Sequence, residues 1–137
     1  MNYDKVLKYS SLPHIDERGI LAVITDKIIK DNFVIKNVFY VKITKEGIIR
    51  GEHAHYKTNE VLFNISGKLE VGYYNKNING QTILNENEGL LIPSLTWISI
   101  KNLIDNSIYL VLMDKEYDED DNIRNKNKFM ELISNDS

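Results

Sequence analysis

The stretch GIIRGEHAHYKTNEVLFNISG, residues 47–67, decides the fold of this chain. It places His53 and His55 one residue apart, follows them with Glu60 and ends on Gly67. Alternate side chains of a β-strand lie on the same face, so both imidazoles should point one way while Ala54 points the other. Two imidazoles on one strand face predict a functional site.

The spacing within this stretch is that of a known motif. Gly47, five residues, His-x-His, four residues, Glu60, six residues and Gly67 reproduce the first cupin motif. The chain therefore resembles the cupins, which are small β-barrels with the site inside. The resemblance implies an all-β fold of the jelly-roll, RmlC-like type.

Imidazoles and a carboxylate at this spacing suit iron, zinc, manganese or nickel. In cupins a fourth ligand, a histidine, comes from a later motif, and here Ile98 stands in that position. Because isoleucine cannot bind a metal, we expect no metal and no other cofactor. His53, His55 and Glu60 could still supply three ligands, so a metal-dependent cupin enzyme remains an alternative.

The composition fits a single cupin domain spanning residues 1–137. The formal net charge is -3 and no basic run is present, so nucleic acid is not expected as a partner. The chain has no cysteine, and its first ten residues, MNYDKVLKYS, lack the apolar core of a signal peptide. We expect a cytoplasmic protein without a membrane segment.

Short apolar runs divided by turn-forming residues predict the strands of a sandwich or barrel. The acidic residues 114–121 follow the last run, and residues 123–133 predict a short amphipathic C-terminal helix. The predicted strands are residues 20–25, 34–44, 60–65, 69–74, 81–84, 89–92, 97–100 and 107–113.

A closer resemblance rests on four stretches. They are DERG at residues 16–19, VFYV at 38–41, RGEHAH at 50–55 and YDEDDNIR at 117–124, the last two being the specific ones. Over nearly its whole length the chain resembles the dTDP-4-keto-6-deoxyglucose 3,4-ketoisomerases. These enzymes serve the synthesis of 3-amino-3,6-dideoxyhexoses, sugars of O-antigens and S-layer glycans.

The resemblance implies that a carbonyl moves from C4 to C3 of a dTDP-linked 4-keto-6-deoxyhexose through an enediol, without a redox cofactor. This isomerisation needs an acid and a base, and histidine suits both roles because its pKa is near neutral. We assign the roles jointly to His53 and His55, and the resemblance favours His55 for removal of the C3 proton. Tyr40, in a strand expected beside the histidine strand, should hydrogen-bond the sugar or a phosphate oxygen.

Binding a nucleotide diphosphate calls for cationic groups, and Arg18 and Arg50 are the candidates because a guanidinium matches phosphate oxygens. Arg18 could instead pair with a carboxylate on its own turn. Trp97 could stack on the base or sugar, although a single tryptophan in a barrel is more often part of the core. Glu60 should lie near the substrate and would raise the pKa of the imidazoles, or be protonated itself if buried. Arg124 is expected on a solvated or capping surface.

Two further classes compete with the ketoisomerase. A non-catalytic sugar-binding cupin would keep the barrel without needing two facing histidines. A metal-free dTDP-sugar epimerase acting at C3 and C5 would show a His–Asp dyad and a separate tyrosine acid, and no such set is evident in the sequence.

The first predicted strand bears on assembly. Residues 20–24 are apolar on both faces and carry neither charge nor proline, so an edge strand there needs a partner. We therefore expect a homodimer, with N-terminal strands exchanged between the subunits.

Overall fold

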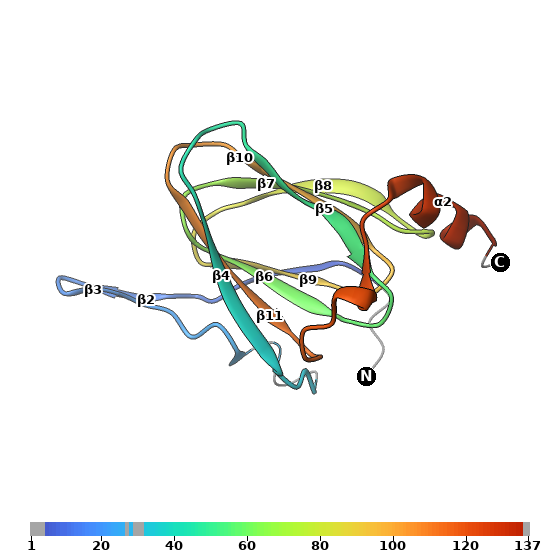
Figure 1. The fold of residues 1–137 in the computed structure, drawn as a ribbon. Helices are drawn as coiled ribbons and strands as arrows, with labels where there is room; N and C mark the ends of the chain where they lie inside the picture. Colours follow the sequence, from blue (N-terminus) through green and yellow to red (C-terminus); the bar gives the residue numbers. More distant parts are fainter. Residues whose placement is uncertain (1–4, 27, 29–31, 136–137) are drawn as a thin grey trace.

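The computed structural model describes residues 5–26, 28 and 32–135, and these form two five-stranded antiparallel sheets that face each other (Figure 1). The first sheet has the order β1-β9-β6-β11-β4 and the second β12-β5-β10-β7-β8. The strands are β1 (Leu7–Ser10), β4 (Asn37–Ile43), β5 (Ile49–His55), β6 (Glu60–Ser66), β7 (Leu69–Tyr74), β8 (Asn79–Leu84), β9 (Glu88–Ile92), β10 (Trp97–Asn102), β11 (Ser107–Met113) and β12 (Asn122–Ile123).

The main core lies between the two sheets and consists of the inward-facing side chains of both. Leu62 and Val111 come from the first sheet, and Leu69, Val71 and Ile100 come from the second. Their alternation with outward-facing residues is the pattern from which the strands were predicted. The all-β prediction is confirmed, in the form of a sandwich of two sheets.

Gly67, the last glycine of the cupin-like spacing, follows β6 and has a steric reason to be glycine. Its φ is +97°, a conformation that side chains rarely adopt. A Cβ at this position would also overlap Ser107 at the start of β11. The tight turn from β6 to β7 therefore requires glycine.

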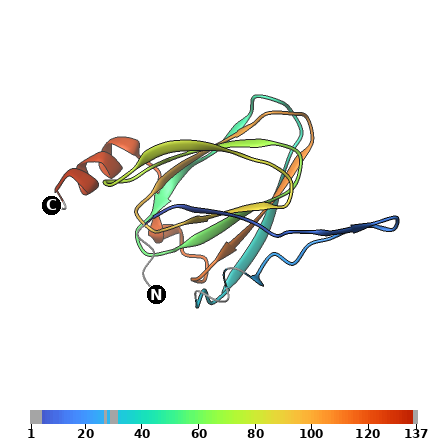
Figure 2. The same ribbon diagram turned by 180° about the vertical axis from the view of Figure 1, so that it is seen from behind.

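An N-terminal hairpin of β2 (His14–Asp16) and β3 (Gly19–Leu21) projects away from the two sheets (Figures 1 and 2). The strand predicted for residues 20–25 ends at Leu21. The hairpin leaves Ile15, Ile20 and Leu21 exposed. Folding of a single chain therefore does not bury the apolar side chains of this hairpin.

The C-terminal helix is α2 (Lys126–Asn135), shorter at its start than the predicted residues 123–133 because Ile123 belongs to β12. Asn125 caps it, since its side-chain oxygen accepts a hydrogen bond from the backbone N–H of Lys128 at 3.0 Å. Phe129 is fully buried and anchors the helix on the outer face of the second sheet, against Trp97 and Ala54.

No helix within the described residues is both long enough and apolar enough to cross a lipid bilayer.

Candidate active site

A β-bulge in β5 shapes the site. His53 pairs with Ile98 on β10, and Gly51 pairs with the next residue, Ser99, so Glu52 is the extra residue of the bulge. Gly51 and Glu52 both have positive φ, at +82° and +58°. Such a bulge bends the strand and changes which face the following side chains occupy.

The bulge puts Arg50 and His53 on the same face although they are three residues apart. Arg50 pairs with Ile100 and His53 pairs with Ile98, and both isoleucines belong to the core between the sheets. Directly paired residues share a face of the sheet, so the arginine and the histidine both point to the interior. A regular strand would have placed them on opposite faces.

His53 and His55 meet inside the sandwich with their ring centroids 5.0 Å apart and their planes at 85°. Both line one cavity, whereas Ala54 packs with Phe129 on the outer face, as strand alternation predicts. Burial lowers the pKa of His53 below its usual value, although the nearby Glu60 carboxylate opposes the shift. His53 is therefore neutral near pH 7.

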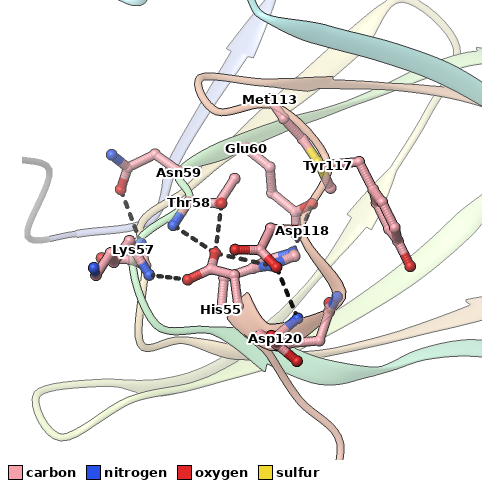
Figure 3. A network of polar contacts seen from close by, with 12 residues as sticks. His55, Lys57, Thr58, Asn59, Glu60, Met113, Tyr117, Asp118 and Asp120 are labelled. Carbon is pink, nitrogen blue, oxygen red and sulfur yellow. Dashed lines mark hydrogen bonds and ion pairs between the residues drawn. The ribbon is translucent and has the colours of Figure 1, made fainter.

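The imidazole of His55 lies between two carboxylates (Figure 3). Its Nε2 is 3.7 Å from Oε2 of Glu60, and its Nδ1 is 3.6 Å from Oδ2 of Asp121. The side chains of His55 and Glu60 are 8% and 5% exposed, and that of Asp121 is 13% exposed. A His–Asp pair therefore exists, in contrast to the sequence interpretation that found none.

The cavity that the histidines line has a volume of about 230 Å³. Its wall is mixed, with apolar and aromatic groups from the first sheet and charged or polar groups from β5 and the C-terminal segment. The other lining residues are Phe39, Val41, Arg50, Gly51, Thr58, Tyr109, Met113, Glu116, Tyr117, Asp118, Asn122 and Arg124.

Two cations reach this cavity. Arg50 lies beside Tyr109. Burial raises the pKa of Tyr109 and Arg50 lowers it, and because burial has the larger effect the pKa is raised overall. Arg124 is held by both carboxylate oxygens of Glu119, with Nε to Oε1 at 2.8 Å and Nη2 to Oε2 at 3.1 Å. Hydrogen bonds from Arg124 and Tyr117 lower the pKa of Glu119 to about 2. The side chain of Arg124 is 57% exposed, so the solvated surface expected for it borders the cavity.

Three predicted site residues are not brought to this cavity within one chain. Tyr40 is 64% exposed and lies between Phe39 and Val41, whose side chains line the cavity, so it points to the opposite face. Its strand, β4, also belongs to the other sheet from β5, so the prediction that the two strands are neighbours is wrong. Trp97 is 5% exposed and its ring lies 5.7 Å from that of Phe129 under α2, which makes it a core residue.

Arg18 is the third. It lies at the turn of the β2–β3 hairpin, its side chain is 82% exposed, and its Nη2 is 2.7 Å from Oδ2 of Asp16. The hairpin carries it away from the cavity of its own chain (Figure 2). The pairing with a carboxylate of the same turn is the alternative that the sequence left open.

His53, His55 and Glu60 could together hold a metal ion. One ligand atom from each lies within 4.8 Å of the others. This donor set of two imidazoles and a carboxylate suits a divalent transition metal. Ile98, directly opposite His53, offers no fourth donor.

Sequence reasoning missed Asp121 and Arg124 as site residues because the acidic run around them is typical of a solvated surface. The fold brings the run to the histidines, since β12 pairs with β5 and places Asn122 opposite His55. The available signal was membership of residues 117–124 in a family-specific stretch. The two most specific stretches, 50–55 and 117–124, thus lie side by side.

The two facing sheets with an internal histidine pair define the cupin class. The fold is similar to that of the Mycobacterium tuberculosis rmlC epimerase, with a TM-score of 0.75 over 85% of this chain and 66% of the other at 16% identity. Within this class, the family model described as "FdtA: WxcM-like, C-terminal" matches residues 5–134. The chain belongs to this family.

Relatives of known activity are isomerases. The chain is 32% identical over 132 residues to the TDP-4-oxo-6-deoxy-alpha-D-glucose-3,4-oxoisomerase of Aneurinibacillus thermoaerophilus, covering 96% of this chain and 93% of the relative. A 3,4-ketoisomerase from Helicobacter canadensis has a TM-score of 0.85 at 27% identity, covering 96% and 99% of the two chains. A Thermoanaerobacterium thermosaccharolyticum ketoisomerase in complex with TDP gives 0.85 at 29% identity, covering 96% of each. The resemblance read from the four stretches is confirmed.

Proposed function

We propose that this protein is a sugar-nucleotide 3,4-ketoisomerase that converts TDP-4-keto-6-deoxyglucose to the 3-keto isomer. The observation that carries the proposal is the histidine pair inside a cavity with two arginines. A similar ketoisomerase, a histidine-to-asparagine mutant from Thermoanaerobacterium thermosaccharolyticum, is known in complex with TDP-4-keto-6-deoxyglucose. The 3-keto product is the form that amination at C3 would consume in making a 3-amino-3,6-dideoxyhexose.

The reaction moves two protons and no net electrons. A base takes the proton from C3, the C3–H electron pair forms the C3–C4 double bond, and the C4 oxygen gains a proton to give an enediol. Loss of the O3 proton and protonation at C4 then leave the carbonyl at C3. The chemistry requires a neutral base, a proton donor and stabilisation of the developing charge on oxygen.

We assign the base to His53, because burial keeps its imidazole neutral near pH 7. His55 has the carboxylates of Glu60 and Asp121 facing its two ring nitrogens. We assign it the donation of a proton to the C4 oxygen or to C4, since the other imidazole is used as the base. This assignment keeps both histidines in the acid–base pair and reverses the preference that the resemblance gave.

Substrate binding follows from the cations. Arg50 and Arg124 present guanidinium groups at the cavity and suit the diphosphate. A neighbouring cavity of about 460 Å³, lined by Lys36, Lys57 and Lys115 among others, offers room for the rest of the nucleotide. Glu60 lies 3.7 Å from Nε2 of His55, and we propose that it influences the sugar through this imidazole.

We also propose a homodimer. The β2–β3 hairpin projects with Ile20 57% exposed and Leu21 62% exposed, and a second subunit would cover these side chains. Arg18 lies on the same hairpin, so any contact it makes with substrate would be in the cavity of the partner.

The second candidate is a metal-dependent cupin enzyme, favoured by the convergence of His53, His55 and Glu60. Treatment with a chelator followed by dialysis separates the two. The ketoisomerase mechanism requires no Lewis acid, so full activity should remain. Loss of activity with recovery on adding one divalent ion would favour the metal enzyme.

The direct test is incubation of the purified protein with TDP-4-keto-6-deoxyglucose, followed by NMR of the sugar. We expect the carbonyl carbon to change from C4 to C3 with wild-type protein. An unchanged sugar, or one with a new configuration at C5 and the carbonyl still at C4, would refute the proposal.

A further inference from the structure

A half-buried carboxylate on the far side of His55 takes no proton in the transfers described above. Asp121 lines the neighbouring cavity and not the cavity of the histidines, so it is not placed to touch the sugar. Its Oδ2 nevertheless lies 3.6 Å from Nδ1 of His55, on the opposite side of the ring from Glu60. Asp121 is therefore in contact with the catalytic pair through His55.

The Asp121 carboxylate is fixed by the backbone that follows His55. Oδ1 accepts a hydrogen bond from the N–H of Lys57 at 2.9 Å, and Oδ2 accepts one from the N–H of Thr58 at 3.1 Å and one from its hydroxyl at 2.6 Å. The carbonyl of Asp121 accepts a fourth bond from the N–H of Tyr56 at 2.9 Å. The segment after the histidine thus wraps around this carboxylate, as Figure 3 shows for Lys57 and Thr58.

His55 has need of such a partner. Neither ring nitrogen forms a hydrogen bond to any group in the described part of the chain, although both are buried. A buried imidazole without partners costs free energy, and the two carboxylates are the groups at ion-pair distance. A separation of 3.6 Å is longer than a hydrogen bond. In the absence of substrate, however, the distances between catalytic groups are often longer than in the complex.

We propose that Asp121 is a positioning residue that holds the proton of His55 on Nδ1 and fixes the orientation of its ring. A carboxylate accepts only, and that of Asp121 is held in place as an acceptor by three hydrogen bonds, so the nitrogen facing it carries the hydrogen. Nε2 is then the nitrogen that exchanges a proton on the side of Glu60 and the substrate. Thr58 supports this arrangement because its two hydrogen bonds to Oδ2 fix the position of that oxygen beside Nδ1. The role rests on the proposed function, since it assigns His55 a proton to deliver.

Asp121→Asn tests the proposal because it keeps the shape and removes the negative charge of the group that faces Nδ1. We expect kcat to fall by about ten- to a hundred-fold, part of the usual general acid–base contribution, with KM little changed. The matched control is Asp120→Asn, which removes the same charge one residue away at an exposed position. It should leave kcat and KM unchanged.

The decisive readout is the imidazole ¹⁵N spectrum, because it reports the tautomer and needs no turnover. At a pH where the ring is neutral, the one remaining hydrogen of wild-type His55 should be on Nδ1, and in Asp121→Asn it should move to Nε2. If that variant does not fold, Thr58→Val, which loses the hydroxyl donor to Oδ2, should give a partial shift in the same direction.

Each outcome has one meaning. An unchanged His55 spectrum, or a kcat equal to that of Asp120→Asn, would overturn the role of Asp121. A wild-type protein that does not isomerise the sugar would remove the proposed function, while the spectrum would still show whether Asp121 fixes the tautomer of His55.

Discussion

Two opposing effects act on the pKa of His53: burial lowers it, and attraction to a nearby carboxylate raises it. Glu60 was expected to raise the pKa of the imidazoles, and it does oppose the shift at His53, but loss of hydration has the larger effect and the pKa is lowered. In the proposed reaction, His53 therefore acts as the neutral base. His55, two residues further along β5, lies between two carboxylates. One strand therefore supplies two imidazoles in different environments.

Replacing either His53 or His55 by Asn should abolish most turnover and leave the fold intact. General acid–base groups contribute about a hundred- to ten-thousand-fold, and asparagine has a similar volume but cannot transfer the proton. Steady-state kinetics and a thermal melt of each variant provide the measurement. Near-normal kcat in one folded variant would exclude that histidine from the mechanism.

The lowered pKa of His53 predicts the pH dependence of kcat/KM. The base must be neutral, so activity should persist below pH 6.5 and fall only as the pH drops through the lowered pKa. Glu60→Gln removes the carboxylate that raises this pKa, so the acidic limb should move to still lower pH. An acidic limb above pH 6.5 in the wild type would show that His53 is not the neutral base.

At the scale of the strand, the bulge in β5 decides which side chains can act together. It brings Arg50 to the face of His53, and it depends on Gly51, where a Cβ would lie 3.1 Å from the carbonyl oxygen of Ile98. Two-residue periodicity predicts the face shared by the histidines but not this change of face. The position of Arg50 in the cavity was therefore inferred from the motif and not from alternation.

Gly51→Ala should destabilise the protein and lower kcat/KM, and Gly47→Ala is its matched control. Both glycines have positive φ, at +82° and +88°, so each variant should lose about 1–2 kcal/mol for a left-handed alanine. Of these two glycines, Gly51 alone has a neighbouring atom that an added Cβ would crowd, because nothing lies within 4 Å of a Cβ at Gly47. Urea unfolding of the two should differ by this contact, and equal losses with equal activity would contradict the role of the bulge.

Whether a strand was predicted from the sequence depends on what stabilises it. The predictions for β7 and β11 are correct to the residue, because their alternating side chains face the core. The strands β1 and β12 were missed because they are short and pair with strands distant in the sequence, and β2 was missed because it has only three residues. Asp121 was missed for the same reason, since only the pairing of β12 with β5 brings it to the histidines.

At the scale of the whole molecule, the hairpin of β2 and β3 is the part that a single chain does not explain. It extends beyond both sheets (Figure 2), and its apolar side chains Ile15, Ile20 and Leu21 are exposed. The proposed second subunit would bury them and would bring the paired Arg18 and Asp16 to another surface. Assembly and the composition of the site are in this way connected.

Light scattering at micromolar concentration should give a mass of twice 15.9 kDa. Leu21→Lys should weaken the dimer because it places a charge in the buried contact. Ile104→Lys is the control, since Ile104 is 45% exposed in the turn between β10 and β11, far along the chain from the hairpin. A stable, active 15.9 kDa wild-type monomer would contradict the proposed dimer.

The position of the carbonyl after turnover in D₂O tests the central claim most directly. Wild-type protein should convert TDP-4-keto-6-deoxyglucose to a sugar with its carbonyl at C3, a new hydrogen or deuterium at C4 and no deuterium at C5. His53→Asn should leave the substrate unchanged over the same period. A carbonyl that stays at C4 while deuterium enters C3 and C5 would identify an epimerase and contradict the account.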